Sequence, residues 1–218
     1  NQNSQDTVKY TYDHQNRVLT KVEPYTVDGI TKISTFEYDK KGNLVKQTVT
    51  RTVNGSEQNT STIFTYDGLG NITSETDSYG YTTRYVYDAN NNRIKEIDSR
   101  YYSQSVDKAP GIVYEYDAMN QLTRTTVFDG TAGTVIAYNE FDGRGNITKS
   151  VNGEGYNASN PSASMGNLYE YEASNHMIKF ISAMKVIKEY TYDGSDRILT
   201  EKDGMGGTIT YEYFLNGN

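Results

Sequence analysis

Tyr190-Thr191-Tyr192-Asp193-Gly194-Ser195-Asp196-Arg197-Ile198 is one copy of a pattern that recurs along the whole chain. The complete pattern has two aromatic residues two positions apart, then an acidic residue, then a turn-forming residue and an aliphatic one. Repeats of this kind decide the architecture of a protein, because each one is a structural unit of its own. The second aromatic residues of the copies are Tyr12, Tyr38, Tyr66, Tyr87, Tyr116, Phe141, Tyr171, Tyr192 and Tyr213.

The pattern predicts a β-hairpin. Two aromatic residues at spacing two place both rings on one face of a strand, and the following Asp starts a type I turn. The fourth residue after the second aromatic tolerates a left-handed backbone in every copy. These residues are Asn16, Gly42, Gly70, Asn91, Asn120, Gly145, Asn175, Asp196 and Gly217. A type I turn followed by a left-handed residue is the three-residue hairpin loop with a bulge.

This loop geometry also predicts which residues pair across the hairpin. The second aromatic should lie opposite the residue six positions further on, which gives an aromatic–aliphatic pair. The predicted partners are Val18, Leu44, Ile72, Leu122, Ile147, Met177 and Ile198. One copy departs from the rule, because after Tyr87 the aliphatic residue, Ile94, comes one position late. We therefore expect that copy to be out of register.

The connections between the hairpins vary in length. The second aromatics are separated by 26, 28, 21, 29, 25, 30, 21 and 21 residues, so 21 is the bare repeat and longer steps are insertions. Residues 27–30 and 53–56 read as two-residue hairpin turns, and residues 78–80 and 203–207 read as short return turns. Residues 98–111 and 152–167, which are rich in Ser, Asn and Gly, read as surface loops.

The fold class that follows is all-β: an antiparallel meander of repeated hairpins. Residues 1–218 form a single array of about nine repeats, the last of them truncated, so we expect the chain to be a fragment of a longer protein. Long open sheets twist and curl, which predicts a spiral ribbon or a partial hollow shell. One repeat buries too little to fold alone and needs its neighbours. Open edge strands also predict edge-to-edge self-association.

Composition excludes several classes of function. A formal charge of −7 is unfavourable for binding nucleic acid, and no apolar run is long enough for membrane insertion. The chain has no Cys, which excludes disulfides and thiolate metal sites. Each turn carries a single carboxylate, unlike a calcium loop. We therefore expect no catalytic residue, no metal and no cofactor, and we interpret the protein as not an enzyme.

The motif Tyr-x-Tyr-Asp-x-x-Gly-Asn-Leu, on a period near 21, resembles the YD repeat (Rhs repeat). This family includes bacterial polymorphic toxins, wall-associated proteins, shells of insecticidal toxin complexes and teneurins. The chain departs from the pattern at Asn139, Glu172 and Phe214. The positions that match the signature are Tyr10, Tyr12, Asp13, Tyr38, Asp39, Gly42, Tyr66, Asp67, Gly70, Tyr87, Asp88, Tyr116, Asp117, Phe141, Asp142, Gly145, Tyr171, Tyr192 and Asp193.

The resemblance implies a structural role. It implies a β-shell that encloses a C-terminal toxin domain, in an exported bacterial protein located outside the cell or on its surface. The partners it implies are the other YD repeats of the full-length chain and the enclosed toxin. The chain has no counterpart of the family's toxin domain, nor of its Asp-Pro-rich self-cleaving segment, so it corresponds to the wall alone.

An alternative function is a cell-surface carbohydrate-binding module that uses rows of tyrosine rings. Aromatic repeats of about twenty residues also build glycan-binding solenoids on bacterial surfaces, and a glycan would then be the partner. Those modules usually carry Trp and have uniform repeats. This chain has no Trp, 21 Tyr and uneven spacing, which favours the shell.

Overall fold

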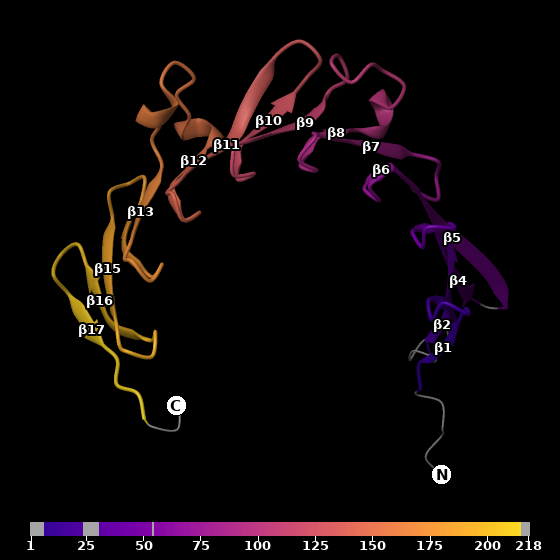
Figure 1. The fold of residues 1–218 in the computed structure, drawn as a ribbon, viewed down its shortest axis with the longest axis horizontal. Helices are drawn as coiled ribbons and strands as arrows, with labels where there is room; N and C mark the ends of the chain where they lie inside the picture. Colours follow the sequence, from indigo (N-terminus) through magenta and orange to yellow (C-terminus); the bar gives the residue numbers. More distant parts are fainter. Residues whose placement is uncertain (1–6, 24–30, 54, 215–218) are drawn as a thin grey trace. The chain divides into compact units, whose positions relative to one another are not determined.

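The structure, a computed structural model, describes residues 7–23, 31–53 and 55–214 (Figure 1). Within these residues it has seventeen β-strands, every strand pair with an assigned register is antiparallel, and the helices are three short 3₁₀ turns. The all-β prediction is confirmed.

The chain divides into two units, Asn1–Pro110 and Gly111–Asn218. No helix in the described part is long and apolar enough to cross a membrane.

Unit 1 is a meander in which each strand pairs with the next one along the chain. Its strands are β1 (Lys9–Tyr12), β2 (Val18–Glu23), β3 (Thr31–Tyr38), β4 (Leu44–Val53), β5 (Ser56–Tyr66), β6 (Ile72–Thr76), β7 (Thr82–Tyr87) and β8 (Arg93–Ile97), followed by the 3₁₀ turn η1 (Ser99–Tyr101). The β4–β5 hairpin has the two longest strands.

Unit 2 repeats the same plan. Its strands are β9 (Gly111–Tyr116), β10 (Leu122–Phe128), β11 (Gly133–Phe141), β12 (Ile147–Asn152), β13 (Asn167–Tyr171), β14 (Met177–Ile181), β15 (Ile187–Tyr192), β16 (Ile198–Asp203) and β17 (Thr208–Thr210). Two 3₁₀ turns, η2 (Gly153–Gly155) and η3 (Pro161–Ala163), lie between β12 and β13.

The turns of the repeat motif have the predicted backbone. Gly42, Gly70 and Gly145 have φ of +95°, +91° and +91°. The non-glycine residues at the same position are also left-handed, with φ between +61° and +72°: Asn16, Asn91, Asn120, Asn175 and Asp196. In each of these copies the strand register shifts beside the second aromatic, as a bulged hairpin requires. The turn prediction is confirmed for every copy whose turn is described.

The predicted cross-strand pairs are also observed. Tyr12 lies opposite Val18, Tyr66 opposite Ile72 and Tyr192 opposite Ile198, and the other predicted partners follow the same rule.

The prediction that the Tyr87 copy is out of register is wrong. Tyr87 lies opposite Arg93, six residues on, as in every other copy. The main chain fixes this register, because Asp88 N donates to Asn92 O at 2.9 Å and Asn91 N donates to Asp88 O at 3.2 Å. This copy differs from the others only in the side chain at that position, which is Arg instead of an aliphatic residue. The guanidinium of Arg93 lies 5.4 Å from the ring centre of Tyr85.

The short return turns behave as predicted. Residues 78–80 and 204–206 form tight turns, with φ of +84° at Gly80 and +92° at Gly206. Val53 pairs with Ser56, and Gly55 has φ of +79°, as a two-residue turn requires. Asn54, residues 27–30 and Gly217 lie outside the described residues.

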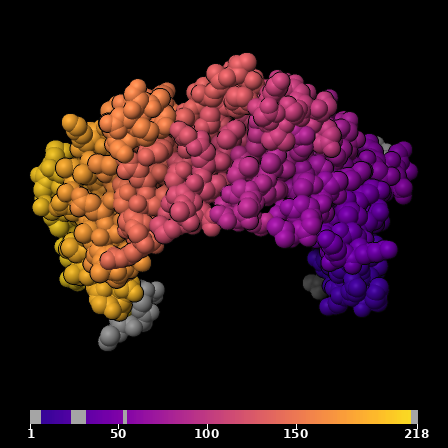
Figure 2. Space-filling view, turned by 45° about the horizontal axis from the view of Figure 1, so that its top comes forward, coloured from indigo at the N-terminus to yellow at the C-terminus, as the bar shows by residue number. Residues whose placement is uncertain are grey.

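The two long connections lie mostly at the surface, as predicted, and each also covers part of the sheet. Among the described residues, few apolar side chains are fully buried, and they gather where these connections cover the sheet: Ile97 and Ala109 are 0% exposed and Val151 is 4% exposed. A single-layered sheet buries few side chains by itself. Where a long connection folds onto the sheet, it covers some of these side chains and creates a small local core. In the space-filling view, segments that follow one another in the sequence lie side by side within each unit (Figure 2).

Candidate interface between repeats

The Asp that recurs after the second aromatic is explained by the turn that it stabilises. Asp39 Oδ1 accepts hydrogen bonds from the backbone N–H of Lys41 at 2.9 Å and of Asn43 at 2.8 Å. Its other oxygen accepts from the side-chain amide of Asn43 at 2.9 Å. The carboxylate thus satisfies three donors inside one turn. The amide of Asn43 is the main cause that lowers the pKa of Asp39 below its ordinary value.

The same arrangement recurs in the other copies. Asp67, Asp88 and Asp142 each accept two backbone N–H groups and one Asn side chain, and the Asn is the main cause of a lowered pKa in each. In the first and eighth copies an Arg takes the place of the Asn. Arg17 pairs with Asp13 at 2.6 Å and Arg197 with Asp193 at 2.7 Å.

The Glu172 turn is a variant that uses different donors. Its carboxylate accepts from the hydroxyl of Ser174 at 2.6 Å and lies 2.7 Å from Nδ1 of His176. The ring of His176 stacks on the ring of Tyr192 in the next repeat, with centroids 4.6 Å apart. The imidazole therefore contacts both repeats. Among the described residues, the hydrogen-bond partners of the Glu172 carboxylate are side chains, whereas the Asp carboxylates of the other copies accept from backbone N–H groups as well.

In several copies, a hydrogen bond from the second tyrosine joins the repeat to the one before it. The hydroxyl of Tyr66 donates to the main-chain oxygen of Leu44 at 2.7 Å, and Leu44 is the residue that pairs with Tyr38 in the preceding copy. The same bond is seen with five second tyrosines, at 2.7–3.0 Å. Their donors are the hydroxyls of Tyr38, Tyr66, Tyr87, Tyr192 and Tyr213, and their acceptors are the oxygens of Val18, Leu44, Ile72, Met177 and Ile198.

We call this bond the tyrosine lock. Its acceptor is always the first residue of the returning strand in the preceding copy, where the bulge leaves a carbonyl outside the regular strand ladder. The lock therefore requires a tyrosine hydroxyl and cannot be made by phenylalanine.

The lock is absent from the Phe141 and Tyr171 copies, both of which the structure describes. Phe141 has no hydroxyl, and the side-chain amide of Asn139 donates instead to Leu122 O at 3.3 Å. Asn139 is the position where the first aromatic of the motif is missing, so the two departures from the pattern compensate each other. Tyr171 has a half-buried ring, but its hydroxyl has no hydrogen-bond partner among the described residues.

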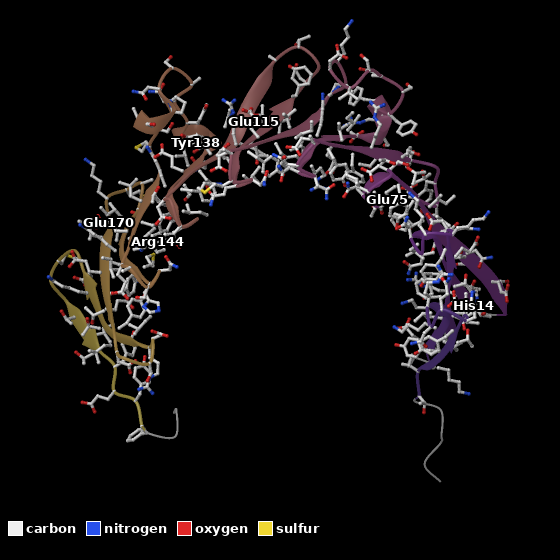
Figure 3. The ribbon with its side chains drawn as sticks, in the orientation of Figure 1. His14, Glu75, Glu115, Tyr138, Arg144 and Glu170 are labelled. Carbon is white, nitrogen blue, oxygen red and sulfur yellow. The ribbon has the colours of Figure 1, made fainter. Side chains whose placement is uncertain are left out.

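Neighbouring turns also contact each other directly. Arg17 places its guanidinium 4.6 Å from the ring centre of Tyr38 and donates from Nη1 to Asp39 O at 3.4 Å. Arg144, labelled in Figure 3, donates from Nη1 to Glu172 O at 3.0 Å. Asparagine side chains link other turns, such as Asn146 to Asn175 at 3.0 Å. Each of these contacts reaches only the next repeat.

The tyrosine rings of the motif are packed between repeats. The second aromatics from Tyr38 onward are half-buried, and burial is the main cause that raises the pKa of Tyr66, Tyr87, Tyr171 and Tyr192. Among the described residues, the exposed motif rings are those at the two ends of the array: Tyr10 at 47%, Tyr12 at 52% and Tyr211 at 37%. The geometry thus gives these rings a packing role and does not form an exposed row of them.

Two buried lysines hold the long connections against the sheet, a role that the sequence pattern did not predict. Lys95 in β8 and Lys149 in β12 occupy equivalent positions and are each 7% exposed. Lys95 Nζ donates to Val106 O and Lys149 Nζ to Ser162 O, both at 2.6 Å. Burial is the main cause that lowers the pKa of Lys95. A buried Lys eight residues after the second aromatic, followed by a long insertion, is the signal that would have predicted this anchor.

The site contains no cluster suited to metal binding. Within residues 7–23, 31–53 and 55–214, no group of three or more His, Asp or Glu side chains could hold an ion. The turn carboxylates face their own backbone.

Comparison with known proteins places the repeat in a family. The RHS Repeat family model matches residues 66–101. The tRNA3(Ser)-specific nuclease WapA of Bacillus spizizenii is 30% identical over 188 residues, which is 83% of this chain and 7% of WapA. The chain therefore spans a small part of that relative's length.

Solved structures match more distantly. The TcdB2–TccC3 structure without its hypervariable C-terminal region has a TM-score of 0.46 and 12% identity, over 97% of this chain and 16% of that one. The TcdB2–TccC3–Cdc42 structure has a TM-score of 0.35 and 11% identity, over 97% and 15%.

The matched segment begins at Tyr66, the second aromatic of the third copy, and runs through the next copy's hairpin and its insertion. The motif, its turn geometry and the match over residues 66–101 agree, so the chain resembles the YD-repeat (Rhs repeat) family.

Proposed function

We propose that this chain is part of the wall of a hollow β-shell, and that the shell encloses a C-terminal toxin domain of a longer, exported bacterial protein. The tyrosine lock is the observation that carries the proposal, because it uses the most characteristic residue of the motif to join repeats. The motif aspartates are likewise occupied by their own turns. In this proposal the wall itself is catalytically inert and its partners are neighbouring repeats and the enclosed domain.

The single-layered sheet supports this role. A wall needs two accessible faces and strong contacts along its length, and the described strands are mostly half-buried on both faces. The ribbon would curl as further repeats are added, since sheet twist accumulates from strand to strand. The array of repeats over residues 1–218 would then be one arc of the wall.

Limited proteolysis of the full-length protein tests the proposal. If the repeats form a closed wall, the C-terminal domain should resist protease in the native protein. A variant with Tyr38, Tyr66, Tyr87 and Tyr192 all changed to Phe should lose several locks and release that domain to digestion. A matched control changes Tyr171, whose hydroxyl has no partner, to Phe and should leave protection intact. Equal digestion of the C-terminal domain in native and denatured protein would contradict enclosure.

A further inference from the structure

One strand edge inside unit 1 is left open. β5 extends past the end of β6 (both labelled in Figure 1), because Ile63 is the first β5 residue that pairs with β6, opposite Thr76. On its other side β5 pairs with β4 from Ser56 to Ile63. Residues 56–62, which we call the open β5 edge, therefore have a strand on one side, and no described strand pairs with their outer side.

The outer side of this segment presents main-chain groups that an added strand could bind. Val53 pairs with Ser56 across a two-residue connection, and in such a hairpin these two residues exchange both main-chain hydrogen bonds. Because bonded and non-bonded pairs alternate, every second residue from Ser56 turns its N–H and C=O toward β4. The N–H and C=O groups of Glu57, Asn59 and Ser61 point the opposite way, to the open side.

The segment lacks the features that usually block edge pairing. Residues 56–62 contain neither Pro nor Lys, and the β4–β5 register runs through them without a bulge. The side chains from Ser56 to Thr60 are all exposed. Proteins protect their edge strands with Pro, Lys or bulges because a regular exposed edge pairs with other chains. The open β5 edge is therefore suited to pairing.

A similar extension in unit 2 is covered. β11 also extends past its next strand, since Ala137 is the first β11 residue that pairs with β12, opposite Asn152. There the turn η2 packs on β11, and a Cβ atom on Gly153 would lie 2.5 Å from Val135 O. The connection after β6 is the return turn of residues 77–81, and no main-chain bond joins its described residues to β5. The cover present in unit 2 thus has no equivalent at β5.

The charge of the segment fits a second copy of the same strand. Glu57 is its only charged residue. An antiparallel pair centred at Gln58 or at Asn59 places Glu57 opposite Asn59 or Ser61 of the second copy, respectively, so no like charges are opposed. The exposed side chains are Ser, Glu, Gln, Asn and Thr, which form no apolar pocket that would select a foreign peptide. A twofold axis through the pair makes the contact self-complementary.

We propose that the open β5 edge is a self-association surface, through which two copies of the chain join β5 to β5 as antiparallel strands. The sequence predicts edge-to-edge association at open edge strands, and this proposal places it inside unit 1. It goes beyond the wall function and does not depend on it, since none of these residues makes a tyrosine lock. A contact this short buries less than the roughly 1,200 Å² of a standard interface, so we expect a weak dimer with a Kd on the order of 100 μM.

Sedimentation equilibrium of the chain of 218 residues should show a concentration-dependent monomer–dimer equilibrium. Asn59→Pro removes the N–H that faces the open side without removing a main-chain bond to β4, so the dimer should weaken about tenfold or more. Asn59→Ala is the matched control, because it keeps this N–H and should dimerise like the native chain. Both variants lose the bond that the Thr50 hydroxyl donates to the Asn59 side chain at 2.7 Å, so that loss cancels in the comparison.

Disulfide trapping locates the contact. The native chain has no Cys, so Gln58→Cys or Asn59→Cys introduces a single thiol near the twofold axis. Opposing Cα atoms in an antiparallel pair lie about 4.5–5.5 Å apart, within the range of a disulfide. Mild oxidation should yield a covalent dimer from at least one of these variants. Ser195→Cys, an exposed control in a turn of unit 2, should stay mostly monomeric at the same concentration.

Circular dichroism verifies that each variant keeps its β structure. The proposal fails if the native chain stays monomeric up to about 1 mM, tenfold above the expected Kd. It also fails if Asn59→Pro associates as tightly as Asn59→Ala, which would place the contact elsewhere, such as at the ends of the array. Equal cross-linking of Ser195→Cys and the two edge variants would likewise overturn it.

Discussion

The hydroxyl of Tyr66 donates a hydrogen bond to the main-chain oxygen of Leu44, 22 residues earlier, at 2.7 Å. Leu44 lies opposite Tyr38 in the preceding repeat, so this bond ties one aromatic pair to the next. The bond explains why tyrosine, and not phenylalanine, is the usual second aromatic of the motif.

Removing that hydroxyl should measurably weaken the array. Tyr66→Phe keeps the ring and leaves the carbonyl of Leu44 without its donor, so the free energy of unfolding should fall by about 1 kcal/mol. Urea denaturation measures the change. Tyr171→Phe is the matched control and should lie within about 0.5 kcal/mol of the native chain, because its hydroxyl has no partner among the described residues. Equal losses in both variants would refute a specific role for the lock.

The copy at Phe141 allows a rescue experiment. Asn139→Leu removes the amide that donates to Leu122 O and should destabilise the protein by about 1 kcal/mol. Adding Phe141→Tyr to that variant supplies the missing hydroxyl and should recover most of the loss. Thermal melts of the single and double variants measure this coupling. If the second change brought no recovery, the two departures from the motif would be unrelated.

The left-handed turn residues predict a second pair of variants. Gly70 has φ of +91°, where a β-branched side chain is strained, so Gly70→Val should cost about 1–2 kcal/mol. Gly68, two residues earlier in the same turn, has ordinary φ and open space around its Cβ position. Gly68→Val should therefore be almost neutral in the same denaturation assay. A loss at Gly68 as large as that at Gly70 would show that any bulky residue disrupts this turn.

Stability should fall in alkali because of the packed tyrosines. Burial raises the pKa of Tyr66, Tyr87 and Tyr192 in the folded protein. The folded state thus favours the neutral phenol, and its advantage is complete below the ordinary tyrosine pKa of about 10 and is lost as pH rises through the raised values. Urea denaturation at pH 9 to 11, with tyrosinate absorbance recorded in parallel, should show the midpoint falling. A constant midpoint across this range would be evidence against the packing of these rings.

Acid should weaken the turns for the opposite reason. Hydrogen bonds from Asn71 lower the pKa of Asp67 below its ordinary value of 3.8. The stabilisation is present above that value and is lost as pH falls through the lowered one. Asn71→Ala removes the main cause of the shift, so its stability should depend less on pH between about 4 and 2 than that of the native chain. Parallel pH profiles for the two proteins would exclude this turn as a source of acid sensitivity.

The hairpins could be predicted from sequence because their determinants are local. Asn16 has to adopt a left-handed backbone, and Val18 then falls opposite Tyr12; both follow from the turn between them. The error at Arg93 has the same origin. The turn's main-chain bonds fix the register whatever side chain follows, so the late arrival of Ile94 carried no information about pairing.

The contacts between repeats could not be predicted in the same way. The lock joins Tyr192 to a backbone oxygen, Met177 O. Every residue has a backbone carbonyl, so the residue type does not reveal which carbonyl accepts the bond. Its position depends on how far the intervening strands and return turn carry the chain. The anchoring of Lys149 to Ser162 O was missed for a similar reason, since the acceptor belongs to an irregular segment of the main chain.

Because each lock reaches only the preceding repeat, the length of the array is free to change during evolution. Deleting residues 177–197, one period of 21, would join His176 to Ile198 and recreate a complete motif after Tyr171. Ile198 O would remain the acceptor for Tyr213. Unequal recombination between two copies of the gene segment would produce such a deletion, or the matching duplication, in one step. We therefore expect that an array linked in this way can gain or lose a whole repeat in one step and still fold.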